Sequence, residues 1–143
     1  MGASIIAYFP GVTDDQVDLQ EGFWNDDKAW ANFMVEQEKD PAILEAVKKL
    51  NAEAIMTFKT EEMEDEDIDW VTPQQLRDAC MKIRDAVRSG ASEAKPLLAA
   101  YGRGANGINP VDQEFVRDLE DIIEIANWGE KLGTNQITLE VTW

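Results

Sequence analysis

Two short stretches, one near each end of the chain, have the pattern of β-strands. Residues 3–9 form a mostly apolar run that a Pro-Gly pair ends, as expected of a buried strand. Residues 137–143 alternate between apolar and polar side chains, which predicts a strand with one buried face. We expect the two strands to pair or to lie close together.

Between these strands, apolar residues recur at helical intervals in four segments. The predicted helices cover residues 26–38, 41–54, 72–88 and 109–128, and a shorter helical piece covers residues 96–100. Together these elements predict a single α+β domain spanning residues 1–143. Its small sheet includes both terminal strands and is covered by three to four amphipathic helices.

The helix over residues 72–88 has the clearest boundaries. Thr72-Pro73-Gln74-Gln75 forms a capping box with proline at the first helical position, and Gly90 ends the helix. Its apolar positions lie within about 120° of arc at 100° per residue. They are Leu76, Ala79, Cys80, Ile83, Ala86 and Val87.

The longest helix, residues 109–128, is predicted to have an apolar side and an acidic side. The apolar side comprises Val111, Phe115, Val116, Leu119, Ile122, Ile123 and Ala126. The acidic side comprises Glu114, Asp118, Glu120, Asp121 and Glu124, and Ile125 also falls on it.

The net charge of −16 restricts the partners that the protein can have. Nucleic acid and anionic membranes would repel such a chain, so we expect no direct binding to either. No segment approaches the ~20 apolar residues that a membrane-spanning helix needs, and we expect a cytoplasmic location.

A run of acidic residues is the most distinctive local feature. Seven of the nine residues 61–69 are acidic, and a tryptophan follows them directly. Charges this dense favour a loop and generate a strong local field, which suits a basic protein partner. The candidate partner-binding residues are Glu61, Glu62, Glu64, Asp65, Glu66, Asp67, Asp69 and Trp70.

Two other interpretations of this run remain open. Trp70 is at least as well explained by a structural role, in which it packs against the first turn of the helix that begins at Thr72. The acids would also be neutralised within the chain if they paired with the basic residues of that helix. These are Arg77, Arg84 and Arg88.

Other motifs do not predict a metal, cofactor or catalytic site. An EF-hand loop starting at Asp65 would need glycine and glutamate where Trp70 and Leu76 stand. Residues 102–107 match G-x-G-x-x-G, but a helical piece and not a strand precedes them. Because the chain has no histidine, the usual nucleophile–imidazole pairs are excluded. Cys80 is expected to be an inert core thiol.

The layout of several segments resembles the YfbM-like bacterial proteins of unknown function. The similarity covers Asp27-Lys28-Ala29-Trp30, the helix after Thr72, and the closing helix–glycine–strand unit, whereas the segment after Trp30 departs from that family. The resemblance implies a small bacterial α+β domain and carries over no catalytic residue.

The leading hypothesis is a non-enzymatic bacterial protein whose acidic surface binds and blocks a basic partner, as an immunity-type inhibitor would. One alternative is a small enzyme that uses paired carboxylates, with or without a divalent cation. Another is a DNA mimic, although seven acids imitate only about 12 Å of duplex.

Overall fold

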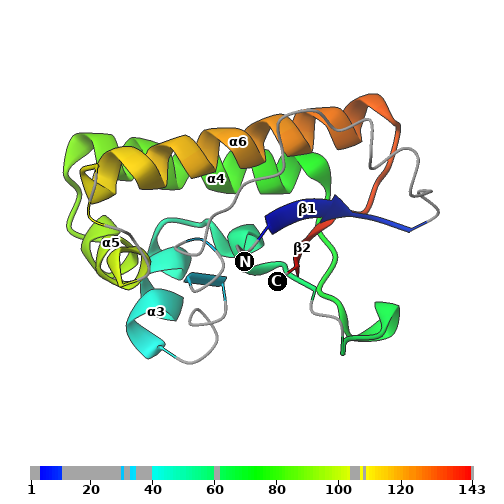
Figure 1. The fold of residues 1–143 in the computed structure, drawn as a ribbon, viewed down its shortest axis with the longest axis horizontal. Helices are drawn as coiled ribbons and strands as arrows, with labels where there is room; N and C mark the ends of the chain where they lie inside the picture. The colour runs from blue at the N-terminus through cyan, green and yellow to red at the C-terminus, as the bar shows by residue number, and fades with distance from the viewer. Residues whose placement is uncertain are drawn as a thin grey trace.

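A two-stranded antiparallel sheet joins β1 (Ser4–Tyr8) to β2 (Thr138–Thr142) in the computed structural model of the protein (Figure 1). The structure describes residues 4–10, 30, 33–34, 40–59, 62–103, 107 and 109–142. The register pairs Ser4 with Thr142 and Tyr8 with Thr138. The prediction that these two strands lie close together is therefore confirmed.

The described residues are mostly helical, so the α+β class holds in its coarse form. The helices are α3 (Pro41–Lys49), α4 (Pro73–Ser89), α5 (Ala94–Gly102) and α6 (Val111–Lys131). Figure 1 shows α4 and α6 running side by side along the molecule, and their contact is the most extensive between any two described elements. The helices thus pack chiefly on one another. The predicted architecture, a small sheet covered by helices, fits the fold only loosely.

Local sequence determines both ends of α4. The Gln75 backbone N–H donates to Thr72 Oγ1 at 3.1 Å, and the Thr72 N–H donates to Gln75 Oε1 at 2.9 Å. This reciprocal arrangement is the predicted capping box. At the other end, Gly90 caps the helix with φ of 72°, a left-handed conformation that favours glycine.

The buried face of α6 differs from the prediction. Glu114, Asp118 and Ile125 were assigned to the exposed acidic side, yet all three are buried. The reason is that α6 is covered on more than one side. It packs along α4, and its Phe115 also lies among the buried aromatic rings of Trp30, Phe33 and Tyr101.

The N-terminal half of the molecule contributes two helical segments to the core. Trp30, Phe33 and Met34 are helical and fully buried, while the rest of the predicted helix over residues 26–38 lies outside the described residues. Asp40 caps α3 through a 2.9 Å bond from the Ala42 N–H. This helix ends at Lys49, before the predicted boundary, and a 3₁₀ helix η1 (Glu53–Met56) follows.

The chain after η1 runs along the edge of β2, where the Lys59 N–H donates to the Leu139 carbonyl oxygen at 2.7 Å. The hydroxyl groups of Thr57 and Thr138 are hydrogen-bonded at 2.6 Å, and both residues are buried. Lys59 forms an isolated bridge to Glu140. The strand was predicted to bury one face, so the burial of Thr138 corrects that expectation.

Within the described residues, no helix combines the length and apolar character that a bilayer crossing requires.

Candidate partner-binding surface

The acidic run forms a loop between η1 and α4, as predicted. Its described part contains one turn of 3₁₀ helix, η2 (Asp65–Asp67), which extends away from the main helices at the lower right of Figure 1. Six of the seven predicted acids are described, and every one is exposed: Glu62, Glu64, Asp65, Glu66, Asp67 and Asp69. The seventh, Glu61, lies outside the described residues.

The backbone of this loop is held from within the fold. Ile68 is buried, and the Trp70 indole N–H donates to the Asp65 carbonyl oxygen at 3.1 Å. The Trp70 ring stacks on Tyr8 of β1, with ring centroids 5.8 Å apart and an interplanar angle of 21°. The Tyr8 hydroxyl donates to Asp65 Oδ1 at 2.8 Å. Thr57 adds a 2.7 Å bond to the Asp69 carbonyl oxygen.

These contacts give Trp70 a structural role as well as a place at the surface. Its half-buried ring packs against the hydrophobic core. Sequence reasoning missed Tyr8, because it lies 57 residues from Asp65 and no local pattern links the two. The hydrogen bond from Tyr8 to Asp65 raises the pKa of the Tyr8 phenol.

The arginines of α4 do not pair with the described acids of the loop, residues 62–69. Arg77 pairs with Glu130 of α6 at 3.0 Å, and Arg88 pairs with Glu120 of α6 at 2.9 Å. Arg84 lies 3.5 Å from the carboxylate of its neighbour Asp85. Within the described chain, no ion pair joins residues 62–69 to any basic side chain. Internal neutralisation by these arginines is therefore wrong.

A groove of about 510 Å³ opens beside Trp70, between η1 and the first half of α4. The apolar residues that line it are Ala54, Val71, Ala79 and Trp70. Exposed carboxylates stand on both walls, Glu53 on η1 and Asp78 on α4. The sequence offered no means of finding this groove, because its walls come from separate elements.

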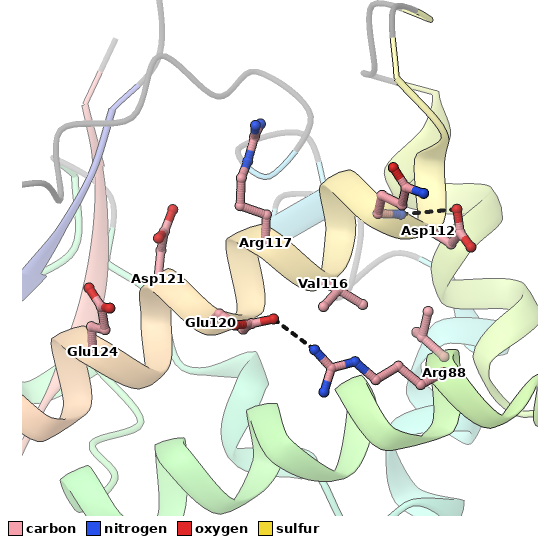
Figure 2. A pocket seen from close by; sticks show the side chains of 9 residues that line it. Arg88, Asp112, Val116, Arg117, Glu120, Asp121 and Glu124 are labelled. Carbon is pink, nitrogen blue, oxygen red and sulfur yellow. Dashed lines mark hydrogen bonds and ion pairs between the residues drawn. The ribbon is translucent and has the colours of Figure 1, made fainter.

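A second groove, of about 570 Å³, follows the seam between α4 and α6 (Figure 2). Val87 and Val116 contribute apolar surface, and the Arg88–Glu120 ion pair crosses the seam. Figure 2 shows Arg117 and Asp121 pointing away from α4, so the charged groups of this groove do not converge on one point. An arrangement without convergent groups gives no support to catalysis at this place.

The buried carboxylates of α6 bear on the alternative of an enzyme with paired acids. Asp118 accepts a 2.5 Å hydrogen bond from the Tyr101 hydroxyl, and Glu114 accepts a 3.3 Å bond from the Asn109 amide. Neither residue lines either groove described above. Each carboxylate thus accepts a hydrogen bond from a neighbouring side chain within the fold.

Metal and thiol chemistry receive no support from the described residues. Within the ranges that the structure describes, no three Asp, Glu or Cys side chains gather in a geometry that would hold a metal ion. Cys80 is fully buried, and burial raises the pKa of its thiol. The prediction that Cys80 lies in the core is confirmed.

Comparisons with known proteins identify no relative. No family model matches the chain, and searches of the curated proteins and of the solved structures find no match either. The YfbM-like resemblance therefore stays a prediction, and function must be argued from the surface itself.

Proposed function

We propose that the protein binds a basic partner protein through its acidic loop, residues 61–70, and blocks that partner as an immunity-type inhibitor does. One observation carries the proposal. Six carboxylates of the loop are exposed and have no ion pair within the described residues, although Trp70 and Ile68 hold the loop and Tyr8 holds the Asp65 side chain.

Anchoring matters because an ordered loop loses less conformational entropy when it binds. A flexible acidic segment would have to be ordered at the moment of association, at a cost in affinity. Unneutralised charges also attract a basic surface and raise the association rate at low salt. We place this activity in the bacterial cytoplasm, with no direct contact to nucleic acid or membrane.

Affinity capture with two matched variants tests the proposal. The loop variant carries Glu62→Gln, Glu64→Gln, Glu66→Gln and Asp69→Asn, and it keeps Asp65, which holds Tyr8. The control variant removes the same number of charges from exposed positions on α3, α4 and α6. Its substitutions are Glu45→Gln, Asp85→Asn, Asp112→Asn and Glu124→Gln.

Tagged wild-type protein and both variants are incubated with extract of the native source at low salt. We expect a basic protein to be retained by the wild type and the control variant and to be lost from the loop variant. The activity of the retained basic protein should fall when the purified wild-type acidic protein is added to it. Equal retention by the loop variant, or no retained protein at low salt, would contradict the proposal.

A further inference from the structure

The groove beside Trp70 is continuous with the acidic loop. Trp70 directly follows Asp69 and lines the groove between η1 and α4. Tyr8 covers one face of the indole and does not line the groove. Trp70 therefore contributes to the groove wall, while its indole N–H is already bonded to the Asp65 carbonyl oxygen.

The charges around this groove favour a cation. Glu53 and Asp78 are exposed on its two walls, and neither has an ion pair within the described residues. Lys82, the basic residue of the lining, donates to the Asn51 carbonyl oxygen at 3.1 Å, near the end of α3. Its ammonium group is thus already hydrogen-bonded to the backbone that follows α3.

Arginine fits this combination of groups better than lysine does. A guanidinium stacks flat on an indole and bonds carboxylates through a planar set of donors, whereas an ammonium is a compact, strongly hydrated charge. The groove volume of about 510 Å³ lies within the range of peptide- and ligand-sized pockets, roughly 300–1,000 Å³. It can therefore hold a side chain together with part of the backbone that carries it.

We propose that this groove receives an arginine-bearing segment of the basic partner, with the guanidinium stacked on Trp70 between Glu53 and Asp78. The inference rests on the proposed function, because it assigns a second contact to the same partner. The acidic loop would supply long-range attraction, and the groove would supply the preference for arginine.

Two labelled peptides of equal charge, octa-arginine and octa-lysine, separate the two contributions. Fluorescence anisotropy at low salt measures their affinity for the wild type, for the loop variant and for a groove variant carrying Glu53→Gln and Asp78→Asn. The matched control for the groove variant carries Glu45→Gln and Asp85→Asn. All four of these carboxylates are exposed, so the folded state should tolerate their replacement.

We expect the wild type to bind octa-arginine about fivefold more tightly than octa-lysine, the factor that about 1 kcal/mol of stacking and pairing gives. The groove variant keeps Trp70 but loses the pairing, so its preference should be reduced while it still binds octa-lysine to within about twofold, whereas its control should keep the full preference. In nitrogen–proton correlation spectra, octa-arginine should shift the Trp70 indole signal, which is assigned by its loss in Trp70→Phe.

Three outcomes would overturn the inference. Equal affinity of the wild type for the two peptides would do so, and so would an arginine preference that is undiminished in the groove variant or an unshifted Trp70 signal. In these cases, weaker binding of both peptides by the loop variant would leave the proposed function standing. If neither peptide binds the wild type at low salt, the proposed function fails and the inference fails with it.

Discussion

The chain has two tyrosines, and each donates a hydrogen bond to an aspartate in a different environment. Tyr101 and Asp118 are 1% and 2% exposed, and their bond is 2.5 Å long. Tyr8 and Asp65 form a 2.8 Å bond at the surface. The two pairs allow the same change, tyrosine to phenylalanine, to be made once inside the core and once outside it.

Tyr101→Phe keeps the aromatic ring but leaves a buried carboxylate without one of its donors. We expect this change to lower the free energy of unfolding by about 2 kcal/mol, because a buried polar group that loses its partner costs roughly 1–3 kcal/mol. Tyr8→Phe should cost less than about 1 kcal/mol, because water can replace the lost bond at Asp65.

Urea denaturation followed by circular dichroism and tryptophan fluorescence measures both changes. With a denaturant slope of about 1–3 kcal/mol per molar, a loss of 2 kcal/mol lowers the transition midpoint by about 1 M. An unchanged slope serves as the control that both variants unfold like the wild type. If Tyr8→Phe destabilises the protein as much as Tyr101→Phe does, burial does not set the value of these bonds and the reasoning is refuted.

Three further predictions follow from the fold. Thr72→Ala should cost about 1 kcal/mol in urea denaturation, because it removes the acceptor for the Gln75 N–H, and Thr72→Ser should restore most of that loss. An ultraviolet titration should show Tyr8 ionising above its ordinary pKa of 10.0, and Asp65→Asn should lower that pKa. Because the folded-state pKa is raised, the stability linked to Tyr8 should be complete below pH 10.0 and be lost as pH rises through the folded-state pKa. Cys80 should resist a thiol reagent in the native protein and react once urea unfolds it, since its thiol is buried. Rapid modification without unfolding would contradict its placement in the core.

Elements with local determinants were predictable from the sequence. The capping box at Thr72, the glycine at position 90 and the intervening apolar stripe define α4 without reference to the rest of the chain. The location of the acidic loop was equally local, since seven like charges in nine residues disfavour regular structure.

Features that depend on distant segments were not predictable. A 100° step finds the most apolar arc of α6, but it cannot reveal that Asp118 meets Tyr101 or that Ile125 is buried. The same limit applies to the candidate surface. The acids could be named in advance, whereas the anchor supplied by Tyr8 and the groove beside Trp70 arise only when separate elements pack together.

The pairing of β1 with β2 determines when the acidic loop becomes ordered during synthesis. β1 leaves the ribosome early, but Tyr8 pairs with Thr138, so this strand cannot pair with β2 until the far end of the described chain has been made. At about 5–20 residues per second, that delay is on the order of 10 s. Throughout it, Trp70 lacks a positioned Tyr8 ring to stack on. The acidic loop is thus present early in translation but acquires its anchored geometry among the last steps of folding.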